Sequence, residues 1–145
     1  MLELDVSSKN ELFAKMAVQA YKAKVVSNKS EFLQSLIERE EQIPTIIGKK
    51  VAVPHGRVGS EGKNVVVLFA RLKNEIIYNT ETSETVKMVF MVSTGTNEKE
   101  YLNALRMIAV NINNESVYQR LLSSRDQAEI HHLLSEIRIS SAQKT

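Results

Sequence analysis

Two uninterrupted apolar runs constrain the fold more than any other feature of this sequence. They span residues 65–70 and 88–92, and neither alternates between apolar and polar side chains. A strand of this kind is covered on both faces, whereas a strand with one wet face alternates. The two runs therefore predict a central sheet with helices on both sides. A third short run, residues 51–53, ends at Pro54, and residues 76–78 predict a short extra strand between polar turns.

Helical periodicity surrounds these strands. Residues 8–23 and 29–41 repeat apolar side chains at helical spacing, and Pro44 prevents the second segment from continuing as helix. Ser8 and Asn28 are candidate N-terminal caps. Three more helices are predicted: one after a strand-to-helix turn at 93–97, a short one near 115–122, and a last one with a capping box that starts at Ser124.

The order of these elements predicts an α/β fold. We expect a three-layer α/β/α sandwich, with a central mixed, largely parallel sheet flanked by helices on both faces. One domain over residues 1–145 is the natural expectation for this length, with an ordered core over about 5–139 and a polar tail.

Composition excludes several classes of function. The net charge is only +2, and the 19 basic and 17 acidic residues are interspersed, so nucleic acid is not expected as a partner. There is no cysteine, which excludes thiol catalysis and cysteine-based metal sites. No apolar run approaches the roughly 20 residues that span a bilayer, and the N-terminus lacks signal-peptide character. We expect a cytoplasmic protein with no direct membrane insertion.

His55 is the residue that most resembles a reactive group. It stands between Pro54 and Gly56 directly after a strand, and ligands bind at strand ends in α/β sheets. Pro54 fixes the backbone before it, and Gly56 lets neighbouring groups approach the imidazole. A neutral imidazole is a nucleophile near neutral pH. Local sequence leaves open a plain loop histidine. His131 and His132 lie in the last predicted helix, away from its apolar stripe, and are expected to be solvated.

Other charged groups can meet His55. If strands 51–53 and 88–92 run parallel, the 93–97 turn lies at the same sheet edge, and the helix that follows it would favour an anion there. Arg39, near the end of the second helix, could supply a guanidinium for a phosphoryl group, or simply complement the helix dipole. Lys49, Lys50 and Arg57 add positive charge near by in sequence, and we expect them on a docking face.

No nucleotide or metal site is visible. Residues 59–64 lack the spacing of a phosphate-binding loop, and the common hydrolase, dinucleotide and zinc-protease motifs are absent. We therefore expect no cofactor and no metal. A phosphoryl group on His55 would have to come from another phosphorylated protein or a small donor.

The segment REEQIPTIIGKKVAVPHG, residues 39–56, resembles the signature of enzyme IIA of the mannitol/fructose class of the bacterial phosphoenolpyruvate:sugar phosphotransferase system, the EIIA type-2 domain. That signature has an acidic or amide residue, here Glu40, then six residues, an apolar residue and a glycine, here Gly48. Two further residues lead to an apolar-Ala-apolar-Pro-His-Gly run that ends here at Gly56. Every position matches, and the order of predicted elements also follows the family.

The resemblance implies a phosphotransferase that carries a phosphoryl group. In the family, the histidine of the Pro-His pair receives the group from the phosphocarrier protein HPr. It passes the group to a cysteine of the cognate IIB domain, which phosphorylates a sugar entering through a membrane IIC permease. Carried over, His55 is the phosphorylated residue and Arg39 stabilises its phosphoryl group. The sugar stays open, because IIA docks proteins and does not bind the sugar.

Two further positions follow from the resemblance. The family often carries a second active-site histidine early in the helix after the third apolar strand, and this chain has Tyr101 there. A tyrosine can donate a hydrogen bond but carries no positive charge. Thr45 stands where the family often has serine or threonine and is a candidate support for the site. The alternative function is a regulatory module whose phosphorylation state controls a partner protein or a transcriptional regulator.

Overall fold

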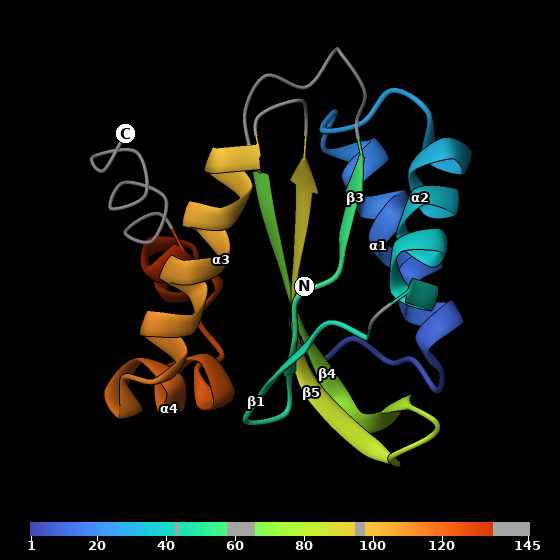
Figure 1. Cartoon of the computed structure of the whole chain (residues 1–145). Coiled ribbons are helices and arrows are strands. Elements are labelled where there is room, and N and C mark those ends of the chain that lie inside the picture. The colour runs from blue at the N-terminus through green and yellow to red at the C-terminus, as the bar shows by residue number, and fades with distance from the viewer. Residues whose placement is uncertain (43, 58–65, 95–97, 135–145) are drawn as a thin grey trace.

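The computed structural model describes residues 1–42, 44–57, 66–94 and 98–134. Within these residues, helices cover both faces of one sheet (Figure 1). The chain order is α1 (Lys9–Lys22), α2 (Lys29–Gln42), β1 (Ile46–Gly48), β2 (Val51–Ala52), β3 (His55–Arg57), β4 (Val66–Asn79), β5 (Glu84–Thr94), α3 (Glu98–Ile112) and α4 (Glu115–Ser123), followed by a helical segment at 127–134. No helix among the described residues is long and apolar enough to cross a bilayer.

Strand β5 lies in the interior of the sheet. Strands β2 and β3 follow one another along one side of β5 and run parallel to it, with His55 opposite Val92. Strand β4 pairs antiparallel along the other side, and β1 extends the sheet antiparallel from β2. The predicted α/β sandwich with a mixed sheet is confirmed, and so is the parallel pairing of residues 51–53 with 88–92.

One strand prediction was wrong. Residues 76–78 are not a separate strand, because β4 runs without a break from Val66 to Asn79 and forms a long hairpin with β5. The register shifts between Arg71 and Ile76. The polar residues 73–75 sit in this irregular stretch and are exposed, so they bend the strand instead of ending it.

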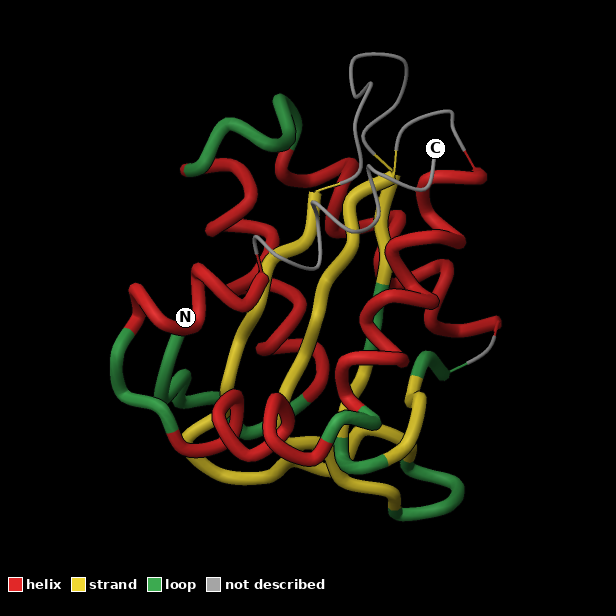
Figure 2. The backbone as a smooth tube through the Cα atoms, turned by 90° about the vertical axis from the view of Figure 1, so that its left-hand side faces the viewer, coloured by secondary structure: helices red, strands yellow, loops and turns green. Residues whose placement is uncertain are grey.

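The core has two layers, one on each face of the sheet. Alternate residues of β5, such as Val89 and Met91, join α1 and α2 in one cluster. Their neighbours Phe90 and Val92 join α3, α4 and the 127–134 segment in the other. Figure 2 shows the strands side by side in the middle of the molecule with helical segments around them. The apolar run 88–92 is therefore explained, because both of its faces are buried. In the described part of the other run, Phe69 and Ala70 are buried and residues 66–68 are partly buried.

The caps agree with the sequence in part. The Ser8 hydroxyl accepts from the Glu11 amide at 3.2 Å, and the Asn28 side chain accepts from the Glu31 amide at 3.0 Å, as predicted. The last helix differs. Its first amides are capped by Asp126, whose carboxylate accepts from Ala128 N–H at 2.9 Å. Asn97, the last residue of the predicted strand-to-helix turn, lies outside the described residues.

Candidate functional site

His55 lies at the start of β3, on the outer side of the sheet relative to β5. The Pro54 carbonyl accepts from Val92 N–H at 2.9 Å, which holds the chain against β5 just before the histidine. Among the described residues, no strand pairs with β3 on its other side. Side chains from α2, on one face of the sheet, and from α3, on the other, can therefore both reach the imidazole at this edge.

Arg39 reaches the imidazole from α2. Its Nε–H donates to Nε2 of His55 at 3.1 Å, and its Nη1 donates to the side-chain oxygen of Gln42 at 3.3 Å. Arg39 lies in the last turn of α2, so it also complements the negative end of the helix dipole. The two readings that the sequence left open for this arginine are therefore compatible in one conformation.

Tyr101 reaches the imidazole from α3. The two ring centroids are 4.4 Å apart and the ring planes are tilted by 41°. Tyr101 belongs to the first turn of α3, and burial is the main reason that the pKa of its hydroxyl is raised. The ring thus contacts the His55 imidazole from the first turn of α3.

The imidazole is kept neutral by this environment. Burial, then the positive charges of Arg39 and Arg57, lower the pKa of His55 to about 4. Because Nε2 accepts a hydrogen bond, the ring proton of neutral His55 lies on Nδ1. Nδ1 is buried and has no hydrogen-bond partner among the described residues. The basic lone pair of the neutral ring is therefore on Nε2, where it accepts the hydrogen bond from Arg39.

Gly56 makes room for Phe32 of α2. A Cβ at this position would lie 2.6 Å from Cε1 of Phe32, so the glycine lets this ring pack against the strand backbone. One residue further, the Arg57 amide donates to the Ser35 hydroxyl of α2 at 3.0 Å. These two contacts join β3 closely to α2.

Among the described residues, no hydrogen bond joins Thr45 to His55. Its hydroxyl donates to Oε2 of Glu40 at 2.9 Å and lies 3.0 Å from the hydroxyl of Tyr78. Its amide donates to Oε1 of Glu40 at 2.8 Å. Thr45 thus belongs to a partly buried polar cluster with Glu40 and Tyr78.

Glu40 is a residue of this region to which the sequence analysis gave no role. It is only 3% exposed. The signal was present: Glu40 follows Phe32 and Leu36 at four-residue steps, on the buried face of α2. A carboxylate on an apolar helix face is expected to have dedicated hydrogen-bond donors, and here it has them.

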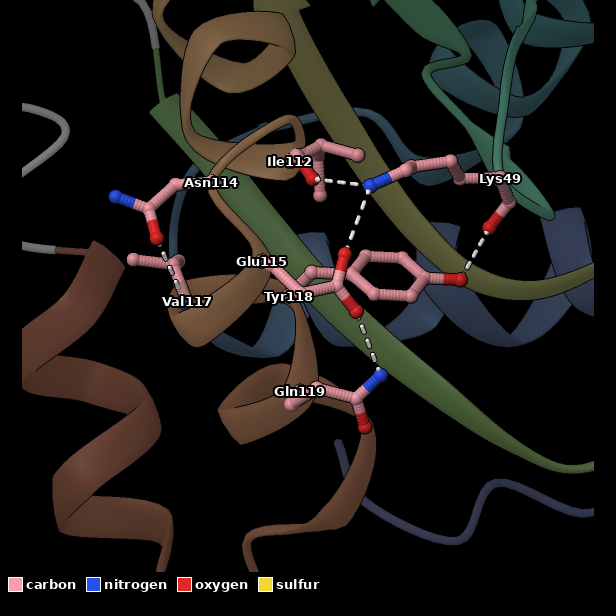
Figure 3. Close-up of polar contacts among 7 residues, drawn as sticks. All are labelled: Lys49, Ile112, Asn114, Glu115, Val117, Tyr118 and Gln119. Carbon is pink, nitrogen blue, oxygen red and sulfur yellow. Dashed lines mark hydrogen bonds and ion pairs between the residues drawn. The ribbon is translucent and has the colours of Figure 1, made fainter.

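Lys49 and Lys50 lie at the opposite end of β2 from His55. They form the turn before β2, with positive φ values of 52° and 61°, whereas His55 follows β2. Figure 3 shows Lys49 Nζ between the carbonyl of Ile112 and the carboxylate of Glu115, at 3.3 and 3.4 Å, while Tyr118 donates to the Lys49 carbonyl at 2.7 Å. Lys50 pairs with Glu75 at 2.9 Å. Both lysines thus pair with other elements. Their place on a docking face stays a prediction.

The remaining histidines are exposed, as predicted. His131 and His132 lie on the 127–134 helical segment, whose buried residues are Ile130 and Leu133. No group of three or more histidine, aspartate or glutamate side chains with metal-binding geometry occurs in the described part of the chain.

Comparisons with known proteins agree with the fold and the signature. The family described as "Phosphoenolpyruvate-dependent sugar phosphotransferase system, EIIA 2" matches residues 1–137. A nitrogen regulatory protein of Bradyrhizobium diazoefficiens is 29% identical over 133 residues, which cover 91% of this chain and 86% of that protein. The mannitol-specific EIICBA component of Escherichia coli is 25% identical over 107 residues, which cover 72% of this chain but only 16% of that much longer protein.

A solved structure extends the comparison to the fold. Enzyme IIAMTL of Escherichia coli, in complex with phosphorylated enzyme IIBMTL, matches with a TM-score of 0.75 and 23% identity, over 93% of this chain and 94% of that one. At that identity the likeness concerns the fold alone. The family match, however, covers nearly the whole chain and includes the His55 signature. This chain belongs to the EIIA type-2 family of the phosphoenolpyruvate-dependent sugar phosphotransferase system.

Proposed function

We propose that this protein accepts a phosphoryl group on Nε2 of His55 and passes it on to a partner protein. The hydrogen bond from Arg39 Nε–H to His55 Nε2 carries this proposal. It fixes a neutral imidazole with its lone pair on Nε2, and it places a guanidinium where the phosphoryl oxygens would arrive.

The transfer is a displacement at phosphorus. The lone pair of Nε2 forms the new P–N bond while the P–N bond to the donor histidine breaks, and His55 keeps its proton on Nδ1. Arg39 is exposed, so its guanidinium can turn from Nε2 to the incoming phosphoryl oxygens. Two features support the anion: this guanidinium, and the amide-rich first turn of α3 behind Tyr101.

The low pKa of His55 favours onward transfer. A nitrogen with a pKa of about 4 is neutral, and hence nucleophilic, throughout the physiological pH range. A weakly basic nitrogen is also a good leaving group, so it holds a phosphoryl group only loosely. Both properties suit a carrier that must be charged and discharged.

The partners in this proposal are an HPr-type phosphohistidine protein as donor and a IIB domain as acceptor. The relative enzyme IIAMTL has been solved in complex with phosphorylated enzyme IIBMTL, which supports a IIB-type acceptor for a chain of this fold. In the carrier function, the IIB cysteine then phosphorylates a sugar that enters through a membrane permease. The protein itself acts as a phosphotransferase in the cytoplasm.

A second function is favoured by a specific observation. The Bradyrhizobium diazoefficiens relative, at 29% identity over 91% of this chain, is a nitrogen regulatory protein. In a regulatory protein of this kind, the output would be the phosphorylation state of His55, read by a partner that need not accept the phosphoryl group.

One experiment separates these possibilities. The purified protein is incubated with phosphoenolpyruvate, enzyme I and HPr, and acid-labile protein-bound phosphate is measured. We expect labelling of wild type and of the control variant His131→Ala, and none of His55→Ala. Unlabelled wild type, or labelled His55→Ala, would refute the proposal. Loss of the label on addition of a IIB domain supports the carrier function, and its persistence with every cognate IIB domain supports the regulatory one.

A further inference from the structure

The C-terminal turn of α2 contains a buried carboxylate beside Arg39. Glu40 is 3% exposed, and no ion pair to it occurs among the described residues. Burial of a carboxylate costs several kcal/mol unless hydrogen bonds replace its water, on the order of the penalty for other buried ions. Both oxygens are used: Oε1 accepts the Thr45 amide at 2.8 Å, and Oε2 accepts the Thr45 hydroxyl at 2.9 Å. Glu40 thus bridges the end of α2 to a residue five positions later.

Thr45 extends this bridge to the segment between β2 and the strand that carries His55. Its carbonyl accepts from Val53 N–H at 2.8 Å, two residues before the histidine. Its hydroxyl proton goes to Glu40, so the hydroxyl of Tyr78, 3.0 Å away, donates to Thr45 in turn. The link from Glu40 to the segment before His55 therefore consists of hydrogen bonds that are at least partly buried. Tyr78 of β4 adds a further hydrogen bond to Thr45.

These bonds form a closed circuit with the Arg39–His55 contact. One side runs from Glu40 through Thr45 and Val53 to His55, and the other runs from Arg39 directly to Nε2 at 3.1 Å. Arg39 and Glu40 are consecutive residues, so a shift of the helix end would move both together. Without the Glu40 bridge, Thr45 would be held less firmly to the end of α2.

We propose that Glu40 is a positioning residue for His55: its carboxylate ties the end of α2 to Thr45 and so holds the Arg39 guanidinium against Nε2. The proposal rests on the proposed function only in assigning the phosphoryl transfer to His55. The positional effect itself exists in the unphosphorylated protein and is measured there.

Substitutions of Glu40 and Thr45 separate positioning from simple stability. Glu40→Gln keeps an oxygen for the Thr45 amide, and its NH₂ group can donate to a Thr45 hydroxyl that turns toward Tyr78. Glu40→Ala removes the whole bridge. Thr45→Val removes the hydroxyl but leaves the hydrogen bond from the backbone N–H of residue 45 to Glu40. This variant provides a milder test if Glu40→Ala does not fold. Val86→Ala, in the core of β5, is the control for lost stability, because the Val86 side chain makes none of the hydrogen bonds of the bridge.

The first measurement is an NMR titration of His55 in protein with ¹⁵N-labelled histidine, without any phosphoryl donor. We expect the pKa of His55 to rise above about 4 in Glu40→Ala, because release of Arg39 removes one of the causes that lower it after burial, and to rise less in Thr45→Val. Glu40→Gln and Val86→Ala should titrate like wild type. If the His55 pKa and Nε2 chemical shift are unchanged in both folded Glu40→Ala and Thr45→Val, the proposal is wrong.

The second measurement is the rate of transfer from phosphorylated HPr. A misplaced guanidinium should lower kcat about tenfold in Glu40→Ala with an unchanged KM, and Glu40→Gln should restore most of it. An equal loss in Val86→Ala at matched stability would show that Glu40 acts only through folding. If His55 is never phosphorylated, the proposed function fails, while the titration still decides the role of Glu40.

Discussion

The Nε–H group of Arg39, in the last turn of α2, donates to Nε2 of His55, at the start of β3, at 3.1 Å. This contact defines which imidazole nitrogen is available, which tautomer is present and where positive charge lies. It joins two residues 16 positions apart that otherwise belong to different layers of the fold.

Substitution of Arg39 should affect transfer and the His55 titration together. We expect Arg39→Ala to lower the transfer rate from phosphorylated HPr by about 10²-fold, a typical loss for one electrostatic contact to the transition state. The pKa of His55 should rise, because a nearby positive charge is removed. Arg39→Lys should restore the charge but not the Nε–H contact, and should recover only part of the rate. Rapid-quench kinetics and NMR titration measure both effects; a normal rate in Arg39→Ala would contradict this role.

The free energy of unfolding should decrease as the pH is lowered from about 6.5 to about 4, the range between the unfolded-state and folded-state pKa values of His55. Its folded-state pKa of about 4 is below the ordinary 6.5, so between these values the unfolded chain binds more protons and stability decreases as the pH falls. Allowing for solvent screening of the half-exposed ring, the loss is about 1–2 kcal/mol. Urea unfolding at pH 7.5, 6 and 5 measures it. The decrease should be smaller in His55→Gln, and an equal decrease would assign it to other groups.

The ring and the hydroxyl of Tyr101 should be separable. Tyr101→Phe keeps the ring over His55, so the pKa of His55 should stay near 4, while loss of one hydrogen-bond donor lowers the transfer rate about fivefold. Tyr101→Ala exposes the imidazole, and the pKa should rise because burial is the largest cause of its low value. NMR titration of both variants checks this; an unshifted pKa in Tyr101→Ala would show that other groups bury the ring.

Substitutions of Gly48, the last residue of β1, and of Gly56, within β3, should destabilise the protein for different reasons. Gly56→Ala places a Cβ 2.6 Å from Phe32 and should cost about 1–3 kcal/mol of unfolding free energy, part of which Phe32→Leu restores. Gly48 has φ +102° and no described heavy atom within 4 Å of an added Cβ, so Gly48→Ala costs backbone strain that Phe32→Leu cannot relieve. Urea unfolding of the single and double variants distinguishes the two causes.

Lys49 should matter little for transfer. Its amine pairs with Glu115 and donates to the Ile112 carbonyl at the end of α3 (Figure 3). Lys49 precedes β2, whereas His55 follows it. We expect Lys49→Met to keep the transfer rate and the KM for phosphorylated HPr within about twofold, as for a solvent-exposed ion pair. Arg57→Ala, next to the site, is the comparison and should raise the pKa of His55. A large rise in KM for Lys49→Met would return this lysine to the docking face.

The sequence predicted those parts of the fold that depend on local pattern. Continuous apolar runs marked the strands that are buried on both faces, and capping residues marked α1 and α2. It missed β1, whose turn has positive φ at Gly48, Lys49 and Lys50 and is held by α3 and α4. Contacts that join residues 63 to 69 positions apart leave no trace in a local pattern.

The site divides in the same way. The spacing from residue 39 to residue 56 singled out His55 and Arg39, and the structure places them in contact. The family resemblance identified Tyr101, in the helix that follows β5, and its ring also contacts the imidazole. The role of Glu40 and the placement of Lys49 needed the structure, because each depends on what the neighbouring elements offer as partners.

The central claim is that His55 accepts a phosphoryl group on Nε2. The most direct measurement is a ¹H–¹⁵N spectrum of histidine-labelled protein after reaction with phosphoenolpyruvate, enzyme I and HPr, which resolves all three imidazoles. We predict that only the His55 signals change, with phosphorus coupled to Nε2 and the proton on Nδ1. Phosphate on Nδ1 of His55 or on His131 or His132, or no phosphorylation of any histidine, would contradict the account.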